Sequence, residues 1–305
     1  MKIDLFSEMR KSPTRLSRHS AARHSAAALI GLACLLTLAA TPVAKGQGFF
    51  SSGVTVQGKN IDLASAGRTN QYGVLATSLT VQDSTHGTDI VGDMGIGLNL
   101  TLDGAVAQGN LYLYSGGTYT TKNGGHITGT KYQDAHQGGT YDTRLYQAAN
   151  DAVTLSNNIS GLTRTTGTPT SITSSTTLND TGSNHINILQ LSNFQLSSGM
   201  TLTLNGTSST RYIINVTNNF SMNNAKVVEV GTGFTAANVI FNYVNQNGNL
   251  TMDNGSVLNS ILVAGSKTFT MDHASTINGE LLAAANCTVN LKNGSKVIHP
   301  PIVSP

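Results

Sequence analysis

The chain is poor in the residue types that many functional classes require. Among its 305 residues there is no tryptophan, there are two cysteines, and charged residues make up only 11%. The 15 acidic residues stand mostly apart, whereas enzymes that cleave polysaccharides need clustered carboxylates. We find no nucleophile motif, phosphate-binding glycine loop or metal-ligand spacing. The sequence therefore predicts a protein that is not an enzyme and has no cofactor or metal.

Two acidic groups come nearest to a catalytic or metal-binding cluster. The first is Asp83, Asp89 and Asp93 with His86, and the second is Asp134, His136 and Asp142. Neither has the ligand spacing of a known metal site. We interpret the first group as turn-forming residues and the second as solvated residues of a glycine-rich loop.

Long apolar runs are also scarce, and the longest extends from Ala26 to Ala40. As a helix it would reach roughly 22 Å, less than the roughly 30 Å of a bilayer's hydrocarbon core. Basic residues precede it, and the small-x-small sequence Ala44-Lys45-Gly46 follows. These features predict that residues 1–46 are a signal peptide cleaved before Gln47, and that the protein is secreted or lies at the cell surface without a membrane span.

Cleavage would change both the charge and the cysteine content. The leader carries 7 of the 18 Lys and Arg residues and 2 of the 15 Asp and Glu residues, so 11 basic and 13 acidic residues remain and the net charge falls from +3 to −2. No basic stripe with interleaved aromatic residues is present, which excludes nucleic acid as a partner. Only Cys287 remains, so the core must stabilise the fold without an intramolecular disulfide.

A five-residue strand pattern recurs along the last hundred positions, at steps of 18, 30, 19 and 18 residues. Side chains alternate across a strand, so the second and fourth residues of each copy face one way and the other three face the opposite way. The inward residues form two apolar columns, Leu202, Phe220, Leu250, Phe269, Cys287 and Leu204, Met222, Met252, Met271, Val289. The outward residues are polar, namely Thr201, Thr203, Asn205, Asn219, Ser221, Asn223, Asn249, Thr251, Asp253, Thr268, Thr270, Asp272, Asn286, Thr288 and Asn290.

This repeat predicts an all-β fold, a parallel β-solenoid, because no coil can bury its apolar face without the next coil stacked on it. A β-sandwich would instead show hairpin signals about every 8 to 12 residues. Helical spacing of apolar residues predicts one α-helix at about 142–160 packed alongside, with Asp142 or Thr143 as N-cap and Gly161 as its end. We expect a linker at 47–70 and the solenoid domain at 71–305.

Several short motifs carry a family resemblance. They are residues 72–76, 91–95, 239–243, 255–264 and 277–283. Together they make the sequence similar to the choice-of-anchor A family, which resembles the ice-binding-like right-handed β-helix proteins. The resemblance covers roughly residues 70–300. It implies a right-handed parallel β-helix flanked by one long α-helix, exported and displayed at or beyond the cell surface.

The outward polar residues are the candidate binding surface. Coils stack about 4.8 Å apart and alternate residues of a strand lie about 6.7 Å apart, so these side chains would form a flat, regular grid. A regular grid suits a repetitive partner such as a glycan or the ice lattice. We expect a monomeric adhesion module for cell-surface attachment, extracellular matrix or glycan, with ice binding as the alternative. A third possibility is that Thr and Asn ladders only stabilise the stack.

Overall fold

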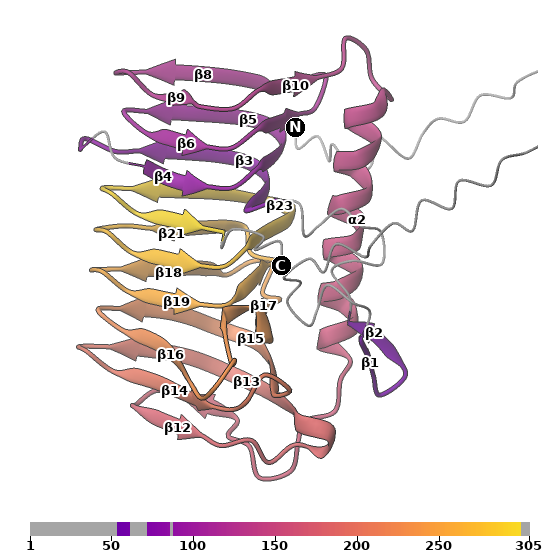
Figure 1. Cartoon of the computed structure of the whole chain (residues 1–305), viewed down its shortest axis with the longest axis vertical. Helices are drawn as coiled ribbons and strands as arrows, with labels where there is room; N and C mark the ends of the chain where they lie inside the picture. The colour runs from indigo at the N-terminus through magenta and orange to yellow at the C-terminus, as the bar shows by residue number, and fades with distance from the viewer. Residues whose placement is uncertain (1–53, 62–71, 86–87, 300–305) are drawn as a thin grey trace, which may run out of the picture. The chain divides into compact units, whose positions relative to one another are not determined.

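The computed structural model describes residues 54–61, 72–85 and 88–299 (Figure 1). The expected signal peptide and its cleavage site lie outside these residues. Apart from one antiparallel hairpin, every strand pairing among them is parallel. The short strands wind into stacked coils, as the repeat predicts.

Two parallel sheets make up the coils. The larger sheet contains, in spatial order, β10 (Lys131–Gln133), β7 (Leu111–Leu113), β5 (Met94–Asp103), β3 (Val74–Gln82), β23 (Leu281–Lys292), β20 (Ile261–Ala264), β17 (Val239–Tyr243), β15 (Arg211–Asn223), β13 (Ile186–Ser197) and β11 (Ser171–Ile172), with β8 (Thr118–Lys122), β18 (Asn249–Asp253) and β21 (Thr268–Met271) pairing off this path. The smaller sheet contains β12 (Thr176–Leu178), β14 (Thr201–Asn205), β16 (Lys226–Val230), β19 (Val257–Asn259), β22 (Thr276–Asn278), β24 (Lys296–Ile298), β4 (Thr88–Val91), β6 (Val106–Gln108) and β9 (His126–Ile127). Two 3₁₀ turns, Ser183–His185 and Ala236–Asn238, precede β13 and β17.

The spatial order of the coils differs from their order in the chain. The chain enters the stack in its middle at β3 and winds outward to β10. It then resumes at β11, at the opposite end, and winds back until β23 pairs with β3. Figure 1 shows this junction, where yellow strands lie beside indigo ones. We call the β23–β3 junction the seam, because it joins the last coil of the domain to the first.

The α-helix α2 (Thr140–Ser160) connects the two halves and lies beside the stack (Figure 1). Its apolar stripe is buried, which confirms the predicted amphipathic helix, and Gly161 ends it. The N-cap prediction was wrong, because the cap is Gly139. Asp142 lies in the first turn, where its carboxylate accepts hydrogen bonds from the backbone and hydroxyl of Ser115. It is therefore a buried tie between a loop and the helix rather than a solvated residue.

An amide ladder fixes α2 to the sheet beneath it. Asn242 donates to Asn215 at 2.8 Å, and Asn215 donates to Gln190 at 2.8 Å. The outer members reach the helix end, since Gln190 donates to the carbonyl of Leu162 and Asn242 to that of Ser156. Because buried amides without partners are costly, this ladder fixes the position of the helix.

A hairpin occupies part of the range that the sequence predicts to be a linker. Strands β1 (Val54–Val56) and β2 (Lys59–Ile61) pair antiparallel around Gln57 and Gly58, whose positive φ angles of 50° and 74° suit a tight turn. Val54, Val56 and Ile61 are buried. The linker expectation fails here because alternating apolar residues give this short segment a face to pack against α2.

The predicted core columns hold for three of the five copies. Phe220, Leu250 and Phe269 stack in one buried column, and three methionines stack beside them. The last copy was assigned two residues out of register, because Val289, not Cys287, lies opposite Phe269. The first copy was assigned to the wrong sheet, because Leu202 belongs to β14 and the neighbour of Phe220 is Phe194. All ten predicted inward residues are nevertheless buried.

Candidate functional site

The outward face of eight strands of the larger sheet forms a surface that we call the polar wall. Its first row is Asn193, Asn219, Asn249, Thr268, Thr288, Ser78, Asn99 and Thr118. Its second row is Gln195, Ser221, Thr251, Thr270, Asn290, Thr80, Thr101 and Thr120. Its third row is Ser197, Asn223, Asp253, Asp272, Lys292, Gln82, Asp103 and Lys122. Neighbouring residues within a row are about 4.8 Å apart, and the rows are about 6.7 Å apart.

The wall contains most of the residues expected on it. Nine occupy their predicted rows, namely Asn219, Ser221, Asn223, Asn249, Thr251, Asp253, Thr268, Thr270 and Asp272. Thr288 and Asn290 also lie on the wall, but the two-residue register error displaces each by one row. Thr201, Thr203 and Asn205 do not, because they face outward from β14 in the smaller sheet. The side chain of Asn286 lies outside the described part of the chain.

Four strands of the structure were not assigned to the wall from the sequence. They are β13, β3, β5 and β8, which extend the wall on both sides of the predicted copies. Three of them carried a usable signal, because 78–82 (SLTVQ), 99–103 (NLTLD) and 193–197 (NFQLS) alternate polar and apolar residues as the recognised copies do. Strand β8 reads TYTTK, and Thr121 at its second inward position obscures the pattern.

The third row is tied into the turns that follow it. The carboxylate of Asp253 accepts a hydrogen bond from His273 at 2.7 Å, and that of Asp272 accepts one from Asn293 at 2.6 Å. Asn254 likewise donates to Asn223 across neighbouring coils. The hydrogen bond to Asp253, together with the charge of Asp272, raises the pKa of His273. These side chains brace the edge of the wall and are already engaged.

The second row is not engaged in this way. Within the described residues, no hydrogen bond joins the side chains of Thr251, Thr270, Asn290, Thr80, Thr101 or Thr120 to another protein group. Thr251 and Thr120 are exposed, and the other four are half-exposed. A ladder that only stabilised the stack would bond these groups to one another. The row therefore offers free donors and acceptors at regular spacing.

The outer face of the smaller sheet differs in character. It mixes the half-exposed Val228 and Val257 with Lys226 and Lys296, and Val230 beside it is 47% exposed. These residues interrupt any uniform polar grid. The polar wall is thus the more regular of the two faces.

Three acids outside the polar wall are buried or partly buried, and they lie in the turn after β3 (Asp83), in β4 (Asp89) and in β16 (Glu229). Asp83 accepts hydrogen bonds from the backbone and hydroxyl of Thr85, as a turn-forming residue would. Asp89 is also buried, and burial, followed by the charge of Asp83, raises its pKa to about 7. Burial also raises the pKa of Glu229 to about 7. His86, expected beside these aspartates, lies outside the described residues.

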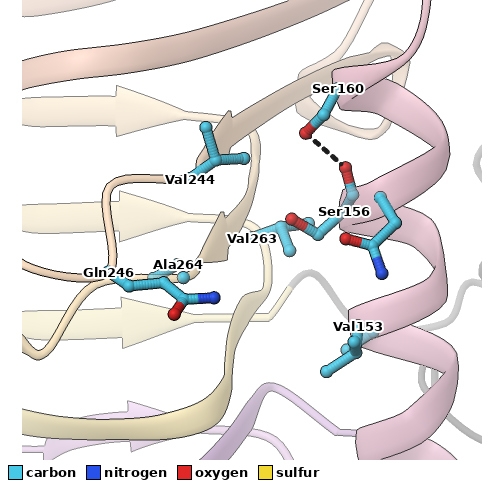
Figure 2. A pocket seen from close by; sticks show the side chains of 10 residues that line it. Val153, Ser156, Ser160, Val244, Gln246, Val263 and Ala264 are labelled. Carbon is cyan, nitrogen blue, oxygen red and sulfur yellow. Dashed lines mark hydrogen bonds between the residues drawn. The ribbon is translucent and has the colours of Figure 1, made fainter.

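Among the residues that the structure describes, no second site of evident chemistry accompanies the wall. A cavity of about 120 Å³ lies between α2, the segment that follows β17, and strand β20 (Figure 2). Val153, Ser156 and Val263 line it, and Ser160 donates a hydrogen bond to the carbonyl of Ser156 at 2.8 Å. None of its lining residues titrates. Across the described ranges, no three His, Cys, Asp or Glu residues gather as metal ligands, and no helix is long and apolar enough to cross a membrane.

A family model described as an ice-binding-like adhesive domain matches residues 45–296. The chain belongs to this family. Membership confirms the resemblance to ice-binding-like proteins that the sequence motifs indicate. The family description is that of an adhesive domain. No functionally curated protein matches the chain.

Several solved structures share the fold at low sequence identity. An ice-binding protein from an Antarctic biological consortium has a TM-score of 0.52 and 20% identity, covering 80% of this chain and 93% of its own. An ice-binding protein from an Arctic yeast has a TM-score of 0.51 and 17% identity, and the match covers 78% of this chain and 94% of the yeast protein. An ice-binding protein domain of Shewanella frigidimarina has a TM-score of 0.51 and 16% identity, and the match covers 76% of this chain and 95% of that domain. They share the overall architecture with this adhesive domain.

Proposed function

We propose that this protein is an exported, non-enzymatic adhesion module that binds a repetitive solid surface through the polar wall. The observation that carries the proposal is the second row, whose Thr side chains are regularly spaced and make no hydrogen bonds within the described protein. The family description, an ice-binding-like adhesive domain, supports adhesion.

Three further features complete the proposal. Residues 1–46 direct export and are removed before Gln47. The coils wind in the right-handed sense that is usual for connections between parallel strands. The module acts as a monomer, presenting the wall to an insoluble glycan or another component of a cell surface or matrix.

Ice is the second candidate surface. The structures that share the fold are named as ice-binding proteins. The wall also contains no exposed aromatic side chain among its three described rows, whereas stacking on a sugar ring commonly uses one. Threonine offers a methyl group and a hydroxyl together, which suits an ordered layer of water.

A paired binding assay tests the proposal. Purified protein would be incubated with insoluble polysaccharides, and in parallel allowed to partition into a slowly growing ice front. Retention on polysaccharide indicates glycan adhesion, and uptake into ice with growth inhibition indicates the second candidate. Retention by neither surface would refute binding by the wall to either.

A matched pair of variants localises any binding. Replacing both Thr251 and Thr270 with Tyr places bulk at the middle of the second row, where the two residues are neighbours on β18 and β21. The control replaces Thr203 and Thr276 with Tyr, because both face outward from the smaller sheet. Thr251 is exposed and the other three positions are partly exposed, and surface substitutions usually change stability by about 0.5 kcal/mol or less each. Loss of binding in the first variant alone supports the wall, and equal behaviour of the two variants contradicts it.

A further inference from the structure

The centre of the polar wall is formed by the first and the last coil of the domain in chain order, which are neighbours in space. At the seam, Thr288 and Asn290 of β23 lie opposite Ser78 and Thr80 of β3. Backbone hydrogen bonds close the seam at both ends, from Leu281 to Gly73 and from Asn293 to Gln82, each at 2.9 Å. The wall therefore continues without a break from the last coil to the first.

Hydroxyl groups are concentrated at this junction. The first two rows of three consecutive strands contain Thr268 and Thr270 on β21, Thr288 and Asn290 on β23, and Ser78 and Thr80 on β3. We call these six residues the hydroxyl patch, since five of them are Thr or Ser. Within the described chain none of their side chains takes part in a hydrogen bond; Thr288 is exposed and the other five are partly buried.

In the first and third rows, the surroundings of the patch are chemically different. In the first row, Asn219 donates to Asn193 at 2.7 Å on one side, and Thr118 donates to Asn99 at 2.6 Å on the other. In the third row, the carboxylates of Asp253 and Asp272 are bonded to turn residues. A group that already has a partner must give it up before it can bond to a ligand, and a charged group loses more solvation when it is covered.

The patch has what a flat contact needs. Thr is branched at Cβ, so its χ1 angle is stiff and its hydroxyl is held at a defined position on a strand. A hydroxyl both donates and accepts, so it can match a lattice of hydroxyls or water molecules in either sense. Small neutral side chains also bury with little desolvation cost compared with amides and carboxylates.

We propose that the hydroxyl patch is the contact element of the polar wall, and that the paired amides and the bonded carboxylates around it keep the wall rigid. The partner presents hydroxyl or water oxygens in a regular array, as a crystalline polysaccharide or ice does. This proposal rests on the function proposed above. It narrows that function to six residues, two of which, Ser78 and Thr80, come from β3 and were not recognised in the sequence.

Three single substitutions in the full mature protein test it. Thr80→Tyr adds bulk inside the patch on β3. Gln195→Tyr adds the same side chain in the same row, but on β13 and outside the patch. Asn290→Thr replaces the one amide of the patch, so that Thr would run unbroken through the second row from Thr251 to Thr120.

Each variant would be assayed on insoluble polysaccharide and on ice, with thermal unfolding to verify that it is folded. On whichever surface retains the wild type, Thr80→Tyr should weaken retention about tenfold, a change of ~1.4 kcal/mol. Gln195→Tyr should leave retention unchanged, and Asn290→Thr should strengthen it about threefold. If retention changes on polysaccharide, the partner presents hydroxyl oxygens, and if it changes on ice, the partner presents water oxygens.

Other outcomes would overturn the proposal. Equal losses from Thr80→Tyr and Gln195→Tyr would mean that the whole wall makes contact, and weaker retention of Asn290→Thr would mean that the amide is a required ligand. Should Thr80→Tyr fail to fold, Ser78→Tyr in the first row of β3 takes its place. If the wild-type protein binds neither surface, it is the proposed function that fails, which separates that failure from one of the patch.

Discussion

Replacing Asp89 with asparagine should stabilise the protein above neutral pH and weaken the dependence of its stability on pH. Asp89 lies in β4 and is 1% exposed, and the backbone N–H of Val106 donates a long hydrogen bond of 3.3 Å to its carboxylate. Its other carboxylate oxygen is buried without a partner. Burial, and then the nearby charge of Asp83, raise its pKa from 3.8 to about 7. The folded state therefore favours the neutral carboxyl.

The sign of the effect follows from the two pKa values. Between pH 4 and pH 7 the folded protein holds a proton at Asp89 that the unfolded chain has released, so stability falls as the pH rises through this window. Above about pH 7 the folded protein must bear the charged form. A shift of about three units corresponds to ~4 kcal/mol of destabilisation at high pH relative to low pH. Asparagine has nearly the same shape as aspartate but carries no charge. The Asp89→Asn variant should therefore regain most of the ~4 kcal/mol of stability at pH 8.

The assay is chemical denaturation of both proteins at intervals from pH 4 to pH 8, giving the free energy of unfolding at each pH. Glu229→Gln should act in the same direction, because burial raises the pKa of Glu229 to about 7 as well. Asp103→Asn, in the half-exposed third row of the wall, is the control. If the wild-type free energy of unfolding does not fall between pH 4 and pH 7, or if Asp89→Asn is no more stable than wild type at pH 8, the electrostatic reasoning is wrong.

Three further predictions address packing, backbone and export. Phe269→Ala should lower the free energy of unfolding by about 3–5 kcal/mol in urea titrations, because the ring is fully buried, and a loss below about 1 kcal/mol would contradict the core assignment. Gly279→Ala should lower the melting temperature, because φ is +154° and a Cβ atom would lie 2.0 Å from the carbonyl oxygen of Ser260; an unchanged melting temperature would count against this corner geometry. Exported protein should begin at or near Gln47, and N-terminal sequencing that finds Met1 or Met9 would disprove cleavage.

Side-chain alternation predicted burial more reliably than register. All ten inward residues are buried because the period of a strand is two, and any shift by an even number of residues keeps them inward. For the same reason the pattern could not reveal that Leu291, rather than Val289, lies opposite Met271. The coil between Thr268 and Thr288 is two residues longer than the repeat suggests. Burial is thus a local property of the strand, whereas register depends on the length of the connecting turns.

Side-chain alternation also could not show which of the two sheets a strand belongs to. Residues 201–205 match the repeat as well as 219–223 do, yet the first set lies in β14 and the second in β15. Both sheets bury one face of each strand against the same core, so both require the same alternation. The corner at Ser198 and Gly199, with φ angles of 54° and 80°, separates β13 from β14. Such a corner could be recognised in the sequence, but not which of the two sheets it leads to.

The spatial order of the coils was the feature that the sequence could least predict. A repeat that is read along the chain implies that neighbouring copies in sequence are neighbours in space. Here α2 carries the chain from one end of the stack to the other, so the copies at 78–82 and 288–292 become neighbours although some 200 residues separate them. Only their pairing joins Thr80 to Asn290 and makes the second row continuous. A search for the binding surface in the recognised copies alone would therefore find four of the six residues of the hydroxyl patch and place them at the end of the wall, whereas the structure places the patch at the centre.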